Sequence, residues 1–194
     1  MMKRTDIINH LIRKCCGTSY LEIGIREPDG NFDHIVCSYK IGVDPAPHRR
    51  DILPITSDQF FAQNKDTFDV IFIDGLHVAD QVERDIVNSL NVLRPNGYVI
   101  CHDMSPTDEI MQMVPNQRVG APWTGDCWKA WVKLRATRPD LQMYVVDTDS
   151  GVGVISIGQQ ETIEVNLNDL SYQNLEINRA NWLNLITTQQ FYEL

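Results

Sequence analysis

The segment from residue 68 to residue 103 constrains the fold more than any other part of the sequence. Phe68 to Ile73 is an apolar run broken only by Asp69, which is typical of a strand buried on both faces of a parallel sheet. From Val78 onward apolar residues recur at helical spacing, and Tyr98 to Cys101 is the next apolar run. A strand, a helix and a strand in this order predict a βαβ unit, so we expect an α/β protein with a mostly parallel sheet.

The residues before this unit predict two more strands. A short apolar run around Tyr20 contains Glu22 and Gly24, and the run from Tyr39 to Val43 ends on Asp44. A glycine lets the backbone approach a ligand, and a carboxylate at the end of the next strand can accept hydrogen bonds from both ribose hydroxyls. The layout therefore suits a cofactor that contains adenosine.

The turn after the first of these strands does not fit a dinucleotide. That turn needs the pattern G-x-G-x-x-G, whereas Gly24 is followed by Ile25, Arg26 and Glu27, and the next glycine is Gly30. The acidic residues around this turn would repel a pyrophosphate but would suit the sulfonium and ammonium groups of S-adenosylmethionine. The pattern favours S-adenosyl-L-methionine over NAD, and a nucleotide-dependent oxidoreductase is kept as an alternative.

Polar side chains gather where the predicted parallel strands end. They are Glu22, Asp44, Asp74, His77, His102 and Asp103. Because ligands of open parallel sheets bind outside the carboxyl ends of the strands, we expect these side chains to lie along one edge of the sheet.

With these strand ends, residues 20–103 resemble the class I S-adenosylmethionine-dependent methyltransferases, and within them the small group related to sugar and antibiotic O-methyltransferases. The resemblance implies a Rossmann-like, doubly wound and mostly parallel sheet in three α/β/α layers, with an antiparallel C-terminal hairpin. It also implies that Ser57 and Asp58, after the third strand, contact the adenine. The alternative is that these two residues only begin a helix.

The leading hypothesis is therefore a methyltransferase that acts on a hydroxyl of a sugar, nucleotide sugar or glycoside. Glu22 and Gly24 would hold the methionine end of the cofactor, Asp44 its ribose, and Asp74 would contact the cofactor, the acceptor or both. A methyltransferase-like binding or assembly subunit without turnover is a further alternative.

Two arrangements could activate the acceptor. Asp74 and Asp103 end strands that, as neighbours, would lie about 5 Å apart, so their carboxylates would converge on one Mg²⁺. Some of the resembled enzymes bind a metal with aspartates at these strand ends. In the alternative, Asp74 contacts the cofactor and Asp103 caps a loop. His77 is the second candidate, as a general base, because the dipole of a helix N-terminus disfavours its charged form. His77 is equally compatible with a hydrogen bond to the backbone, and His102 is best interpreted as satisfying a turn.

Composition limits the partners. A net charge of −9 argues against nucleic acid, and we expect a small-molecule or glycan acceptor. Five cysteines without a C-x-x-C pair predict reduced thiols and a cytoplasmic location. No apolar run has the length of a membrane span. At 194 residues, the chain is expected to form a single domain over 1–194.

The remaining segments predict the periphery of the fold. A helix is expected from about Thr5, a short helix over residues 31–37, and a loop or lid over 104–126 that carries acceptor specificity. Trp123 in this loop is a candidate platform for a sugar ring. Residues 141–157 predict the hairpin, and 159–194 a helical tail that packs on the body or on a second copy, in a homodimer.

Overall fold

A computed structural model describes residues 2–118 and 120–194, so Met1 and Val119, the latter within the predicted lid, lie outside the described residues. Seven strands form one sheet in the order β2-β1-β3-β4-β6-β5-β7. Their bounds are β1 Ser19–Ile23, β2 Tyr39–Val43, β3 Phe68–Ile73, β4 Leu93–Cys101, β5 Leu141–Val146, β6 Val152–Ile157 and β7 Leu185–Ile186. The first four strands of the chain are parallel, and β6 runs antiparallel to both β4 and β5. The predicted mostly parallel sheet with an antiparallel hairpin is confirmed.

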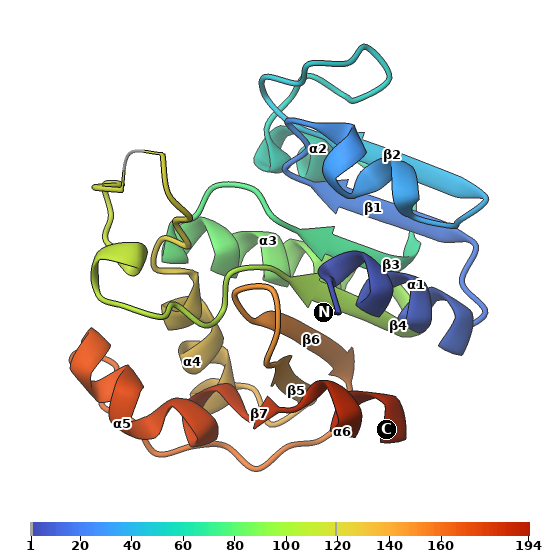
Figure 1. The fold of residues 1–194 in the computed structure, drawn as a ribbon. Coiled ribbons are helices and arrows are strands. Elements are labelled where there is room, and N and C mark those ends of the chain that lie inside the picture. The colour runs from blue at the N-terminus through green and yellow to red at the C-terminus, as the bar shows by residue number, and fades with distance from the viewer. Residues whose placement is uncertain (1, 119) are drawn as a thin grey trace.

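Helices cover both faces of this sheet (Figure 1). They are α1 Arg4–Lys14, α2 Ser57–Gln63, α3 Ala79–Asn91, α4 Cys127–Thr137, α5 Tyr172–Leu183 and α6 Thr188–Glu193, with 3-10 turns η1 Pro28–Gly30, η2 Phe32–His34 and η3 Ile110–Gln112. Alternation along β3 sends Val70 and Phe72 into the apolar cluster that includes α1 and α6, and Ile71 and Ile73 into the cluster under α2 to α5. The three-layer architecture follows from this alternation.

The βαβ unit forms as its pattern predicts. Val82 and Ile86 of α3 are buried in the core cluster shared with β3 and β4. The helix ends at Asn91, before Pro95, and the following strand begins earlier than the apolar run, at Leu93. A register shift between Phe68 and Val70 of the partner strand accommodates these extra residues.

Two peripheral predictions need correction. The short helix predicted over 31–37 is wrong, because only η2 forms there, after η1, and Ile35 already has an extended backbone. The tail after residue 158 contains not only helices but also β7, which pairs with β5 at the edge of the sheet. Leu175 and Leu183 of α5 are fully buried, so this tail packs on the body of the same chain. None of the described helices combines the length and apolarity that crossing a membrane requires.

Candidate active site

A cavity of about 630 Å³ opens at the carboxyl edge of the sheet, beside the ends of β1, β2 and β3. Its lining includes six of the residues singled out in the sequence: Gly24, Asp44, Ser57, Asp58, Asp74 and His77. Gly24 has a φ of +90°, and a Cβ on it would lie 2.1 Å from the carbonyl oxygen of Asp74. Only glycine therefore allows the backbones after β1 and β3 to approach each other here.

Asp44 stands at the mouth of this cavity, directly after β2. Its Oδ1 accepts a hydrogen bond from the backbone N–H of Ala46 at 2.7 Å. Its own N–H donates to the carbonyl of Leu53. These two bonds fix the carboxylate at the end of the strand before any ligand binds.

Ser57 and Asp58 line the opposite wall at the start of α2, where Thr56 is the N-cap and completes a capping box with Gln59. Gln81 of α3 donates from Nε2 to Ser57 Oγ and to Asp58 Oδ1, both at 3.2 Å. The structure thus shows helix-start residues that also face the cavity, so the two interpretations of this pair are compatible.

Glu22 does not line the cavity. Its side chain shares the face of β1 that packs under α1, and its Oε2 accepts hydrogen bonds from Tyr20 Oη at 2.5 Å and Asn31 Nδ2 at 2.9 Å. Burial raises the pKa of Glu22 to about 7, against the hydrogen bonds from Tyr20 and Asn31, which lower it. The predicted role of Glu22 at the methionine end of a cofactor would therefore be indirect.

This buried carboxyl predicts a pH effect on stability. Because its pKa is raised from 4.5 to about 7 by folding, the folded state loses up to about 3 kcal/mol relative to the unfolded state as pH rises across that interval. The Glu22→Gln variant keeps an acceptor for Tyr20 and Asn31 but cannot ionise. We expect its unfolding free energy in urea to match wild type near pH 4.5 and to exceed it near pH 8. Parallel curves at all pH values would contradict the assignment.

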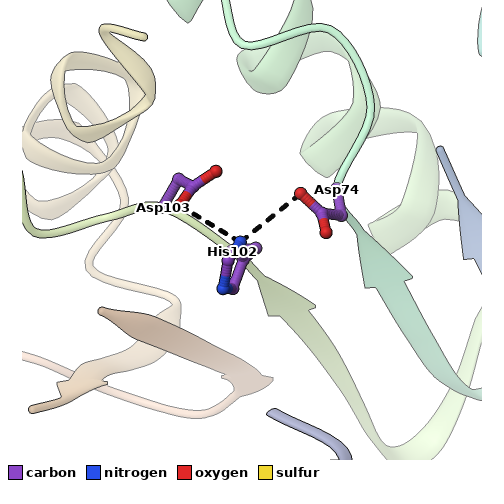
Figure 2. A group of neighbouring side chains, drawn as sticks. All are labelled: Asp74, His102 and Asp103. Atoms are coloured by element: carbon purple, nitrogen blue, oxygen red, sulfur yellow. Dashed lines mark ion pairs between the residues drawn. The ribbon is translucent and has the colours of Figure 1, made fainter. Parts of the chain in front are cut away.

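Asp74, His102 and Asp103 form the second part of the site (Figure 2). Asp74 follows β3, and the other two residues follow its neighbour β4. His102 Nδ1 lies 3.1 Å from Asp103 Oδ1 and 3.4 Å from Asp74 Oδ1, so one ring nitrogen faces both carboxylates. Asp103 has a φ of +64°, a left-handed backbone that is uncommon outside glycine and that gathers at functional sites.

His77 joins this cluster from the segment before α3. Its Nε2 lies 3.3 Å from Asp74 Oδ1, and its Nδ1 lies 3.3 Å from Asp103 Oδ2 and 3.1 Å from the carbonyl oxygen of Trp123. Burial lowers the pKa of His77, but the hydrogen bond to Asp74 and the charges of Asp103 and Asp74 outweigh burial and raise it above its ordinary value. The expectation that a helix dipole keeps this imidazole neutral is wrong, because two carboxylates dominate.

Asp74 is partly buried among its partners. Burial raises the pKa of its carboxyl, but His102, His77 and the positive charge of Arg4 together hold it below the ordinary value. Asp74 is therefore ionised at neutral pH.

The segment 123–126 holds His77 in place. The Trp123 ring stacks on the His77 imidazole with centroids 5.2 Å apart and an angle of 21° between the rings. Asp126 Oδ1 accepts a hydrogen bond from the N–H of Ala79, the first residue of α3. Asp126 is the N-cap residue of α4, yet its side chain makes no capping hydrogen bond there and stabilises the start of α3 instead.

Sequence reasoning missed two members of this edge, Arg4 and Asp149, and assigned His102 only to a turn. His102 is 8% exposed and central to the cluster, and Arg4 and Asp149 contact it. No local pattern marks Arg4 or Asp149, because they lie 145 positions apart and meet only through the fold. His102 alone carried a signal, its place directly after a buried strand.

Comparison with known proteins shows which protein family the sequence is similar to. Residues 27–104 match a family model described as a methyltransferase domain. This part of the chain is therefore similar to a methyltransferase domain. This confirms the resemblance seen in the sequence. The matched range includes Asp44, Ser57, Asp58, Asp74, His77 and Asp103. No match to this sequence was found among curated proteins.

Solved structures share the fold of the methyltransferase domain. An O-methyltransferase from Bacillus cereus in complex with SAH is 14% identical, with a TM-score of 0.57, over 81% of this chain and 83% of that one. TomG from Streptomyces achromogenes, an O-methyltransferase of tomaymycin synthesis in complex with SAM, is 13% identical, with a TM-score of 0.55 and 78% of each chain covered. MycE of the mycinamycin pathway, in complex with Mg, SAH and mycinamycin VI, is 13% identical with a TM-score of 0.52, over 86% of this chain and 53% of that one. At these identities the likeness establishes the fold.

Proposed function

We propose that this domain transfers the methyl group of S-adenosyl-L-methionine to a hydroxyl of a small molecule, with a sugar, nucleotide sugar or glycoside as the acceptor class. The observation that carries the proposal is the cavity at the carboxyl edge, whose lining brings together Gly24, Asp44, Asp74 and His77. The cavity brings together residues that follow three different strands, as predicted from the strand ends.

The cavity suits the cofactor chemically. Asp44 can accept both ribose hydroxyls at the end of β2, and Ser57 and Asp58 lie where the adenine would reach α2. Asp74 gives the methionine end a negative charge that attracts its ammonium and sulfonium groups. Arg26 also lines the cavity and offers a positive partner for the methionine carboxylate.

The cofactor supplies an activated methyl carbon, and the chain's residues orient the acceptor and manage its proton. His77 is the histidine among the residues that line the cavity, and it is the proposed proton acceptor. In its neutral form it takes the proton of the acceptor hydroxyl, and Asp74 and Asp103 then stabilise the imidazolium at 3.3 Å each. The catalytic roles of His77, Asp74 and Asp103 are thus parts of one proton-accepting group.

The acceptor would enter beside His77. Leu76, which lines the cavity, is 59% exposed, and the Trp123 ring stacks on the imidazole of His77, another lining residue. An apolar side chain next to an aromatic ring suits the C–H face of a sugar while its hydroxyl points to His77. This lining supports a sugar as the acceptor, and the O-methyltransferases that share the fold support a hydroxyl as the methylated group.

Calorimetric titration tests the cofactor assignment. We expect wild type to bind S-adenosylmethionine and not NADH. The Asp44→Ala variant should bind it about 30-fold more weakly, since charge-assisted hydrogen bonds to the ribose worth about 2 kcal/mol are lost. Asp44→Asn keeps the oxygen that accepts from Ala46 and should fall between the two. Asp66→Ala, a change in an exposed loop, is the control. Tight NADH binding, or equal affinity in wild type and Asp44→Ala, would contradict the proposal.

A further inference from the structure

The N-terminus of the chain is docked against the carboxyl edge of the sheet. Thr148 Oγ1 donates a hydrogen bond to the carbonyl of Met2 at 2.6 Å, and the N–H of Arg4 donates to Asp149 Oδ2 at 3.0 Å. Thr148 and Asp149 both belong to the turn between β5 and β6. These bonds fix the first residue of α1 beside the Asp74–His102–Asp103 cluster.

The side chain of Arg4 enters that cluster. Its Nη1 lies 2.7 Å from His102 Nε2 and 3.3 Å from His102 Nδ1. The same nitrogen lies 3.9 Å from Asp74 Oδ2 and 3.7 Å from Asp149 Oδ1. A guanidinium has no acceptor, so a hydrogen bond from Nη1 to Nε2 requires the tautomer with its proton on Nδ1, which faces Asp74 and Asp103.

We propose that the guanidinium of Arg4 takes the place of a divalent ion at this cluster. In this arrangement the side chain of Arg4, rather than a metal ion, supplies the positive charge beside the carboxylates of the cluster. The inference rests on the proposed function for the identity of the acceptor side, and it makes Arg4 a positioning residue for Asp74 and His102.

The donor set supports this assignment. Asp74, His102 and Asp103 offer ligand atoms within 4.8 Å of one another, which is the spacing of a metal site. A metal bound through His102 Nδ1 would need that nitrogen without its proton, and it would lie against the positive charge of Nη1, which is 3.3 Å away. Mg²⁺ also prefers oxygen ligands to an imidazole. The predicted Mg²⁺ at Asp74 and Asp103 therefore does not fit the cluster while Arg4 occupies it.

Charge explains what removal of Arg4 would do. Asp74, Asp103 and Asp149 surround His102, and Arg4 is the one residue among the described ion pairs of this cluster that is neither a histidine nor a carboxylate. Without the guanidinium, the carboxylates gain net negative charge and His102 Nε2 loses its donor. A neutral substitution should therefore open a site for a transition-metal ion with nitrogen and oxygen ligands.

Calorimetric titration with MnCl₂, with MgCl₂ as comparison, tests the proposal on four folded proteins: wild type, Arg4→Gln, Arg4→Lys and Arg4→Gln/Asp103→Asn. We expect Arg4→Gln to bind Mn²⁺ at least tenfold more tightly than wild type. Arg4→Lys, which keeps the positive charge, should behave like wild type, and the double variant should lose the gained site. Circular dichroism checks that each variant is folded. If Arg4 had only a structural role, its replacement would give no gain of metal binding.

Two results would overturn the inference. One is Mn²⁺ binding in wild type as tight as in Arg4→Gln and lost in the double variant. The other is a folded Arg4→Gln protein that gains no Mn²⁺ affinity. S-adenosylmethionine is titrated into wild type in parallel. Failure of that titration alone would remove the proposed function, whereas normal cofactor binding with either contrary metal result would remove only the role of Arg4.

Discussion

The His77→Asn variant is expected to lower kcat by a factor of about 10²–10⁴ while its affinity for S-adenosylmethionine changes little. His77 lines the cavity and lies 3.3 Å from both Asp74 and Asp103, and in the proposed function it accepts the proton of the acceptor hydroxyl. Asparagine keeps a polar group that can bond to the backbone of Trp123, so the loop should hold its place. Single-turnover methyl transfer at saturating cofactor and acceptor measures the chemical step.

The matched control is His34→Asn, which changes an exposed histidine on η2. It should leave kcat at the wild-type value. A loss confined to KM in His77→Asn would mean that His77 only binds the acceptor. Full activity in that variant would remove it from the mechanism.

The sheet could be predicted because its signals are local. The apolar run of β3 and the helical spacing of α3 can each be seen in a short stretch of sequence. Burial of the sheet on both faces requires the apolar residues of β3. The same logic placed Asp44 and Asp74 at one edge, because parallel strands must end on the same side of the sheet. The strand-end residues that line the cavity follow from topology alone.

The details of the site depend on contacts that topology does not specify. Alternation along β1 turns Glu22 away from the cavity and under α1, although it stands two residues before Gly24. The pKa of His77 depends on two carboxylates that approach from separate strands, and these outweigh the helix dipole used in the prediction. Arg4 reaches the cluster from a position 98 residues before His102 in the sequence.

The Gly125→Ala variant is expected to lose about 4 kcal/mol of unfolding free energy. Gly125 has a φ of +58°, a left-handed backbone that costs other residues ~1–2 kcal/mol. A Cβ there would also lie 1.9 Å from the carbonyl oxygen of His77, and backbone cannot move aside as a flexible side chain can. The clash adds a further ~1–3 kcal/mol and pushes the 123–126 segment off His77.

Gly120→Ala separates these two causes. Gly120 has a φ of +75°, but a Cβ on it meets nothing within 4 Å. Urea unfolding should therefore show a loss of only ~1–2 kcal/mol for Gly120→Ala, the cost of the backbone conformation alone. Because the Trp123 ring stacks on His77, tryptophan fluorescence should change in Gly125→Ala and not in Gly120→Ala. Equal losses in the two variants would show that segment 123–126 does not press on His77, and the proposed support of the catalytic histidine would fail with it.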